Sequence, residues 1–435
     1  MVVTIVVLLI LAGVTISLLL DENGIIKKSK DARREYGTSK TNEQEQMDNA
    51  NDWIEEATGK VTLAKVPVGT KASKNGTING EEGNSNNPTI PKNYIPIDTA
   101  TSTWGDGSTA PSKDSVKHGL VIKDEKNNEW VWVPVDSATL ATMYEESSDE
   151  KTLCGTTGET AVKTKLYSST ITIGKDSNTK TITRTEPGTT SSPYYREPDL
   201  VVGSNGLSYD AKDTYYKTIL GKNGTKEELA QLFVEDYKEM IESIQKYGGF
   251  YIGRYELSEA GVKKDQPTLI STNWYNLYKE CKSLNASDKV ETRMIWGCQW
   301  DVTMNWLISS GAKTNDEVNK DSSSWGNYYN TSVKADDGTK EIKASKTPSV
   351  LNTGVTTFTM ANNIYDLAGN CWELTQEASY TNLRANRGGC YNNVGSGNPA
   401  SNFGSDYPGS DGGGFLRFSS HFNNKVILES INLSV

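Results

Sequence analysis

The strongest hydrophobic pattern in the chain lies at its start. Residues Val2–Leu20 carry no charge and are almost entirely apolar. A helix of this length, at about 1.5 Å per residue, just spans a hydrocarbon core of roughly 30 Å. A secretory signal peptide is the alternative, but the apolar run is long for one, with no basic segment before it and no small-residue cleavage site after it. The pattern therefore favours a membrane helix over residues 1–20.

Two polar segments follow the apolar run. Residues 21–57 have only sparse apolar positions and predict a solvated helical stalk. Residues 58–119 are rich in Thr, Gly, Asn and Pro, which is typical of a linker or a loosely folded entry segment. Basic residues cluster just after the apolar run, and the positive-inside rule alone would place the rest of the chain in the cytoplasm.

Patterns typical of a folded domain begin near Leu120. The sequence GLVIKDEKNNEWVWVPV predicts a β-hairpin that turns at residues 126–128. The clearest helix is predicted over Thr225–Tyr247, because its apolar residues keep helical spacing and Gly248 and Gly249 follow it. A Thr, Ser and Gly-rich insert at 140–224 separates the two elements.

The rest of the domain is predicted to contain short elements. GGFYIGRYELS reads as a buried strand, with Glu256 and Arg254 as a structural ion pair at best. Short helices are expected over Trp274–Ser283 and Trp300–Ser309, and strands and loops elsewhere. The pattern predicts a mixed α+β fold with short irregular strands and few helices.

Composition narrows the classes of function. The net charge is -10 without a basic stripe, which argues against a nucleic-acid partner. Two histidines, His118 and His421, are too few for a histidine-rich metal site or a histidine-based triad. The five cysteines form no CxxC pair, so a structural zinc site is not supported.

Five segments in the last two hundred residues resemble motifs of one enzyme family. They are FYIGRYELS (Phe250–Ser258), RMIWGCQWDVTMNWL (Arg293–Leu307), NIYDLAGNCWELT (Asn363–Thr375), RGGCY (Arg387–Tyr391) and GFLRF (Gly414–Phe418). Their order is that of formylglycine-generating enzyme domains, the sulfatase-modifying-factor family, which has a variant of the C-type lectin fold. The resemblance implies a C-type lectin-like domain over residues 120–435.

The start of the chain resembles a second family. The apolar run and the ENGII sequence after it are similar to the amino-terminal helix of type IV pilin-like proteins. In that family a short charged leader is removed and the bulk of the chain lies outside the cell. This sequence begins inside the apolar run and has no early glutamate in the helix, so pilus assembly and a plain anchor both stay open. The resemblance implies a membrane-anchored protein on a bacterial surface.

The resemblance to formylglycine-generating enzymes implies an oxidase activity, but the residues at the expected copper-binding positions of this chain do not fit it. The enzymes hold copper with two cysteines a few residues after the R-G-G motif, and the matching positions here are Asn393 and Asn398. An amide cannot bind Cu(I) as a soft thiolate does. Cys390 occupies the serine position of the motif rather than a ligand position. We therefore expect no oxidase activity and no cofactor, and a nucleophilic role for Cys390 is disfavoured.

The polar run after Arg387 suggests binding. Between Gly388 and Phe415 there is no Lys, Glu, Gln, Met or Trp. This composition resembles the variable region of diversity-generating-retroelement target proteins, in which asparagine codons are randomised on a lectin-like fold; an ordinary Gly, Ser and Asn-rich loop is the alternative. The candidate variable region is 388–418, with Gly395, Pro399, Ala400 and Ser401 as scaffold. The candidate ligand-binding positions are Tyr391, Asn392, Asn393, Val394, Asn398, Phe403, Ser405, Asp406, Tyr407, Ser410 and Asp411.

Two smaller features are left open. Cys371 and Cys390 would be cross-strand partners within disulfide reach if their segments form a hairpin, although two packed thiols are the commoner state. An oxygen-rich set leaves calcium open, with turn capping as the favoured role. The set is Asn363, Asp366, Asn370 and Glu373.

The sequence as a whole favours a membrane-anchored display protein. Its lectin-fold face would bind a protein or glycan on another cell or phage, through residues suited to a paratope. A catalytic member of the formylglycine-generating family and a structural pilin-like subunit are the alternatives.

Overall fold

The structure is a computed structural model, and it describes part of the chain. Most of the insert at 140–224, the predicted anchor and stalk over 1–57, and most of 407–425 lie outside the described residues. Among the residues it does describe, no helix is long and apolar enough to cross a membrane. The described ranges are 77–78, 81–82, 84–91, 94–105, 110–143, 145–152, 163–168, 170–173, 180–183, 195–196, 219, 226–270, 272–284, 286–287, 290–379, 383–406, 422–423 and 426–430.

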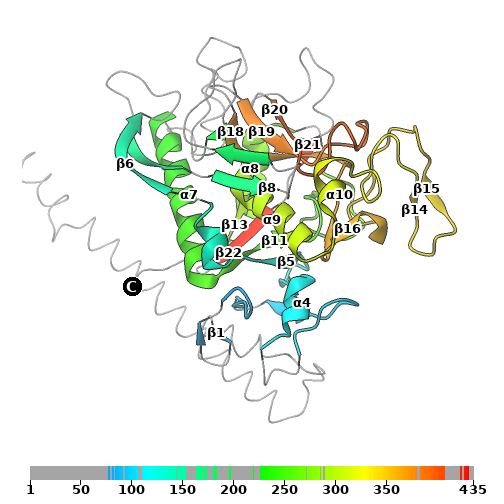
Figure 1. Ribbon diagram of the computed structural model, residues 1–435, viewed down its shortest axis with the longest axis horizontal. Helices are drawn as coiled ribbons and strands as arrows, with labels where there is room; N and C mark the ends of the chain where they lie inside the picture. The colour runs from blue at the N-terminus through cyan, green and yellow to red at the C-terminus, as the bar shows by residue number, and fades with distance from the viewer. Residues whose placement is uncertain are drawn as a thin grey trace, which may run out of the picture. The chain divides into compact units, whose positions relative to one another are not determined.

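An antiparallel sheet of seven strands, counted within the described residues, forms the centre of the fold (Figure 1). The strand order is β12-β13-β22-β11-β5-β4-β3. The strands are β3 (Ile95–Ile97), β4 (Val121–Lys123), β5 (Glu129–Pro134), β11 (Gly249–Gly253), β12 (Ala286–Ser287), β13 (Val290–Met294) and β22 (Val426–Ser430). The last of these strands in sequence therefore lies inside the sheet, between β13 and β11.

Hydrophobic cores pack on both faces of this sheet, and alternate residues of β4, β5, β11 and β22 enter different cores. In β5, Trp130 and Trp132 belong to one hydrophobic cluster and Val131 and Val133 to the other. In β11, Tyr251 joins the first cluster. With no solvated face to keep polar, β5 and β11 contain continuous apolar runs, Trp130–Val133 and Phe250–Ile252.

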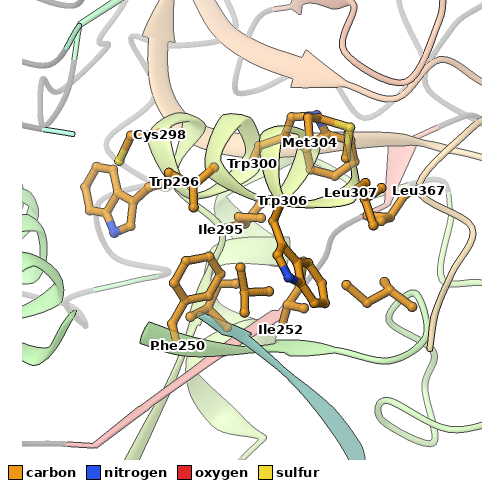
Figure 2. Close-up of a cluster of buried hydrophobic side chains, with 14 of the residues drawn as sticks. Phe250, Ile252, Ile295, Trp296, Cys298, Trp300, Met304, Trp306, Leu307 and Leu367 are labelled. Atoms are coloured by element: carbon orange, nitrogen blue, oxygen red, sulfur yellow. The ribbon is translucent and has the colours of Figure 1, made fainter. Parts of the chain in front are cut away.

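Helices cover the two faces. They are α4 (Lys113–Lys117), α5 (Ser137–Leu140), α7 (Lys226–Tyr247), α8 (Trp274–Ser283), α9 (Gly297–Ser309), α10 (Asn315–Asn319) and the 3-10 helix η3 (Thr357–Thr359). Helix α8 contributes Trp274, Leu277 and Tyr278 to the first core. Helix α9 is buried almost all round and packs Trp300 and Trp306 in the second core, where Trp306 lies close to Ile252 of β11 (Figure 2).

A second, smaller sheet contains the strands in which the NIYDLAGNCWELT motif ends and the RGGCY motif begins. It comprises β10 (Tyr195–Arg196), β18 (Trp372–Ser379), β19 (Leu383–Arg387), β20 (Phe403–Asp406) and β21 (Phe422–Asn423). Neighbouring strands within this sheet are antiparallel, except that β21 runs parallel to β18. Gln376 of β18 donates from Nε2 to the carbonyl of Met294 at 2.8 Å, and Trp274 Nε1 donates to the carbonyl of Thr375 at 2.7 Å. These bonds attach the smaller sheet to the larger.

The remaining strands form two-stranded pairs. They are β1 (Thr77–Ile78) with β2 (Glu81–Glu82), β6 (Glu145–Thr152) with β7 (Lys163–Ser168), β8 (Thr170–Ile173) with β9 (Lys180–Thr183), β14 (Val333–Lys334) with β15 (Glu341–Lys343), and β16 (Met360–Ala361) with β17 (Ile364–Tyr365). With these short strands and few long helices, the described fold is mixed α+β.

Several predicted elements are confirmed, and two details differ. The β4-β5 hairpin, α7 and α8 lie where the sequence places them, but α9 begins at Gly297 rather than Trp300 because Gln299 caps it through the backbone of Trp296. Arg254 pairs with Glu129 at 2.8 Å and not with Glu256, because both residues lie beyond the end of β11 and Glu256 accepts instead from Asn370 and the amide of Cys371. Part of the predicted entry segment folds with the domain, since β3 joins the sheet and Trp104 is buried.

A fully buried arginine joins the second sheet to helix α9. Arg387 of β19 donates to Asp301 Oδ1 of α9 at 3.1 Å and to Glu377 Oε2 of β18 at 2.6 Å. All three side chains have no solvent exposure. The guanidinium also lies 5.5 Å from the ring centre of Phe403, the first residue of β20. One side chain thus fixes three strands against one helix.

Replacing Arg387 should destabilise the domain severely. In Arg387→Met two buried carboxylates lose their shared cation, and we expect about 3–5 kcal/mol less unfolding free energy in urea denaturation. Lys320→Met, which removes an exposed ion pair with Asp316, should cost about 1 kcal/mol or less. Arg387→Lys, which keeps the charge but loses the fork, should fall between them. Equal losses for the buried and exposed variants would contradict this role.

Candidate functional site

The candidate site is the loop that leaves β19 and returns as β20. It begins at Gly388, runs through residues 391–402 and ends at β20. Its backbone turns on itself at both ends: the amide of Asn393 donates to the carbonyl of Cys390 at 2.9 Å, and that of Asn402 to Pro399 at 2.7 Å. The loop is therefore a folded element with a defined backbone rather than an extended connection.

Exposure divides the loop into two kinds of position. Gly395, Pro399, Ala400 and Ser401 are buried, whereas the described candidate ligand-binding positions are exposed or half-buried. Those positions are Tyr391, Asn392, Asn393, Val394, Asn398, Phe403, Ser405 and Asp406. Tyr407, Ser410 and Asp411 lie outside the described residues, as does the GFLRF motif.

The buried positions are fixed by backbone contacts to helices α9 and α10 and the segment after them. Trp300 Nε1 donates to the carbonyl of Ala400 at 3.1 Å, and the amide of Ser401 donates to the carbonyl of Val318 at 3.1 Å. A Cβ on Gly395 would lie 2.5 Å from the backbone nitrogen of Ser323. These contacts hold the loop at Gly395 and at Ala400–Ser401, while Ser396 and Gly397 between them are exposed.

Neighbouring atoms approach both glycines of the R-G-G motif so closely that no side chain fits there. Gly388 and Gly389 have φ of +86° and +77°. A Cβ on Gly388 would come within 2.4 Å of the Glu373 carboxylate, and one on Gly389 within 2.6 Å of the carbonyl of Asn398. A side chain at either position would force the loop away from the sheet.

Asn370 ties this region to neighbouring segments. Its Oδ1 accepts from Asn327 Nδ2 and from the amide of Leu351, each at 2.9 Å, and its Nδ2 donates to Glu256. The carbonyl of Asn370 accepts from the amide of Tyr391 at 2.9 Å. The residue adopts φ of +56°, a conformation that asparagine tolerates better than most. The turn before Trp372 is thus a structural junction beneath the loop.

Two other members of the oxygen-rich set, Asp366 and Asn363, also serve as turn and junction residues. Asp366 Oδ2 accepts from the amide of Gly354 at 2.7 Å, and Asn363 Nδ2 donates to the carbonyl of Gly119 at 2.8 Å. A separate acidic group on α7 and β13, Asp236, Glu239 and Glu291, surrounds the guanidinium of Arg293. That arginine supplies the positive charge on which the three carboxylates converge.

The positions that match the enzymes' copper ligands make ordinary polar contacts. Asn393 Oδ1 accepts from the backbone nitrogen of Cys390 at 3.0 Å, and Asn398 Oδ1 accepts from Asn402 Nδ2 at 3.0 Å. Both amides therefore stabilise the turns of the loop. Neither offers a thiolate to a soft metal.

Cys390 is a buried thiol. Its Sγ lies 2.9 Å from Asn392 Oδ1 and 3.1 Å from Asn393 Oδ1, either of which can accept its single proton. Burial raises the pKa of Cys390 to about 12. The nucleophilic form of a cysteine is its thiolate, so at neutral pH the residue holds a proton and packs as a small apolar group.

Cys371 and Cys390 are neighbouring free thiols. Both are buried, and burial raises the pKa of Cys371 well above its usual value, with the Glu256 carboxylate adding to the effect. The predicted hairpin is present, but its register pairs Glu373 with Arg387. That register is one residue away from the one that would set the two cysteines directly opposite each other.

Tyr329 is an exposed residue beside the loop that the sequence patterns do not indicate. Tyr329 is 36% exposed, and its amide donates to the carbonyl of Asn393 at 2.8 Å. The neighbouring Asn330 accepts from the amide of Gly395 at 3.3 Å through Oδ1. These residues lie some sixty positions earlier in the sequence and in no resemblance motif, so only the fold brings them to the loop.

Comparison with known proteins finds similarity at the level of structure. No family model matches the chain, and no curated protein matches it. A solved structure described as Treponema denticola variable protein 1 is similar at 13% sequence identity and a TM-score of 0.26. The likeness covers 41% of this chain and 84% of that chain.

The buried Cys390 thiol should make stability depend on pH in the alkaline range. Because its folded pKa of about 12 exceeds the unfolded value of about 8.5, the folded state binds more protons above pH 9 and loses stability as pH rises. The stability difference between wild type and Cys390→Ser should therefore shift against wild type by about 1.4 kcal/mol per pH unit between roughly pH 9 and 11. Urea unfolding at several pH values measures it, and a constant difference would mean that the thiol ionises equally in both states.

Proposed function

We propose that this protein is a ligand-binding display protein whose variable face is the loop after β19. This face comprises the candidate positions from Tyr391 to Asp406, with Tyr407, Ser410 and Asp411 continuing it. Its ligand is a protein or glycan on another cell or phage. Residues 1–57 would anchor the domain in a bacterial membrane as a pilin-like helix and stalk, with the domain outside the cell.

The observation that carries the proposal is the separation of buried and exposed positions within one short loop. Gly395 and Pro399–Ser401 are buried, while Asn392 and Val394, just before Gly395, are exposed to solvent. Side chains at the outward positions can therefore be exchanged without changing the packed core. Rigid scaffolds that present variable loops in this way are typical of binding proteins.

The chemistry of the outward positions suits contact with a macromolecule. Tyrosine and phenylalanine provide large rigid contact areas at low entropic cost, and asparagine, serine and glycine provide adaptable hydrogen bonds. The described part of the face carries a single formal charge, on Asp406. Binding would then depend on shape and hydrogen bonding more than on long-range electrostatic attraction.

We further propose that the domain is C-type lectin-like, of the formylglycine-generating-enzyme type. The R-G-G and D-L-A-G-N-C-W motifs lie where close backbone approach and a junction need them, at Gly388 and Asn370. The enzyme alternative is weaker, because Asn393 and Asn398 stand at the copper positions and Cys390 is a buried, protonated thiol. The third candidate function is that of a structural pilin-like subunit without a ligand.

A library in the full-length chain tests the binding face. Randomising Tyr391, Asn392, Val394, Asn398 and Ser405 together should leave the domain folded and yield binders of micromolar affinity or better. The probes are purified lysozyme, purified streptavidin and beads that carry a mannose oligosaccharide. Enrichment by surface display and thermal unfolding of selected clones are the measurements.

A second library on helix α7 is the matched control. It randomises five exposed positions, Glu235, Lys238, Glu242, Gln245 and Lys246, on a regular surface that belongs to no loop. This library should stay folded but yield no binders. Equal yields from both libraries, or unfolding of the loop library, would contradict the proposed binding face.

The neighbouring DNA tests whether the loop is diversified naturally. We expect a reverse-transcriptase gene and a template repeat that matches codons 388–418 and differs from them only at template adenines. Sequencing several isolates should show the differences concentrated at the outward positions. Isolates that vary equally at Gly395 and Pro399 would contradict the assignment.

A further inference from the structure

We propose that Tyr329 is a fixed aromatic anchor of the binding face, and that the ligand it contacts is a protein surface. The inference rests on the proposed function and extends it to a residue outside the candidate variable region. Tyr329 would contact ligands whatever side chains the neighbouring loop carries, while the loop would decide which ligand is bound.

The first argument is position. The large hydrophobic side chains exposed among the described residues are Ile95 at 41%, Tyr329 at 36% and Val394 at 42%. Two of these three are brought together, because the amide of Tyr329 bonds to the carbonyl of Asn393, immediately before Val394. Adjoining backbone segments thus each carry an exposed large hydrophobic side chain, one aromatic and one aliphatic.

The second argument is rigidity. Every backbone carbonyl from Tyr328 to Thr331 accepts a hydrogen bond. Lys343 Nζ, itself buried, donates to Tyr328 at 2.6 Å and to Thr331 at 2.7 Å. The amide of Lys346 donates to Tyr329 at 2.6 Å, and Ser345 Oγ donates to Asn330 at 2.9 Å. The backbone that carries the Tyr329 side chain is therefore held before any ligand arrives.

The third argument is the connection between this segment and the loop. Asn330 bridges them, since its Nδ2 donates to Ser323 Oγ at 2.9 Å and its Oδ1 accepts from the amide of Gly395. Tyr328 lies beneath, where its buried hydroxyl donates to the carbonyl of Gly388 at 2.8 Å. Exchange of outward loop residues leaves these backbone contacts in place, so Tyr329 keeps its position relative to the loop.

Energetics favour a residue of this kind at the centre of a protein interface. A preorganised aromatic side chain loses little conformational entropy on binding, and tyrosine is enriched among the few residues that contribute most of an interface's affinity. The adjoining Asn, Ser and Gly positions can form the polar surroundings that exclude water. A protein ligand with an apolar depression matches Tyr329 and Val394 better than a uniformly hydroxylated glycan does.

Two otherwise identical loop libraries in the full-length chain test the inference. Both randomise Tyr391, Asn392, Val394, Asn398 and Ser405, and one also carries Tyr329→Ala. Selection against lysozyme should give binders from the Tyr329 library and few or none from the other. Introducing Tyr329→Ala into selected clones should weaken lysozyme binding about tenfold or more, while Tyr329→Phe, which keeps most of the contact area, should cost far less.

Ile95→Ala is the matched control, because Ile95 is as exposed as Tyr329 but lies on the edge strand β3. It should leave binding unchanged. Equal yields and affinities from the two libraries would overturn the role of Tyr329 and leave the proposed function standing. Clones that bind only the mannose-oligosaccharide beads would overturn the protein ligand, and failure of both libraries on every probe would overturn the function and the inference together.

Discussion

The buried ion cluster of Arg387, Asp301 and Glu377 is the constraint on which the candidate site depends. A charge without solvent contact is costly unless it is paired and hydrogen-bonded, so these three side chains accept very few arrangements. Their arrangement fixes β19 against β18 and α9. The loop begins directly after Arg387, and Phe403 packs over the guanidinium where the chain returns. Both ends of the loop are thus set by one interaction that is closed to solvent.

Local pattern predicts much of this fold. Helices α7 and α8 and the β4-β5 hairpin follow from residue spacing and turn residues, because the signals that define them lie within each segment's own sequence. The R-G-G glycines could also be anticipated, since only glycine fits their positive φ beside Glu373 and Asn398. These are cases in which the residues themselves carry the reason for the structure.

Long-range partners could not be predicted in the same way. The sequence suggests Glu256 as the partner of Arg254, yet the strand order brings Glu129 to it, and Glu256 turns to Asn370 instead. Tyr329 is a similar case, because nothing near it in sequence marks it as a neighbour of residue 393. Such contacts depend on which distant backbone segments the fold brings together, and a single sequence does not state that.

The position of β22 has a consequence for the folding of truncated or frameshifted forms of the protein. Residues 426–430 come after the whole loop in sequence, yet they form a strand between β13 and β11 in the main sheet. A copy that ends early or changes reading frame within 388–418 lacks that strand, and the two halves of the sheet lose their common neighbour. Substitutions in the loop leave β22 in place, whereas a chain without β22 would expose the edges of β13 and β11.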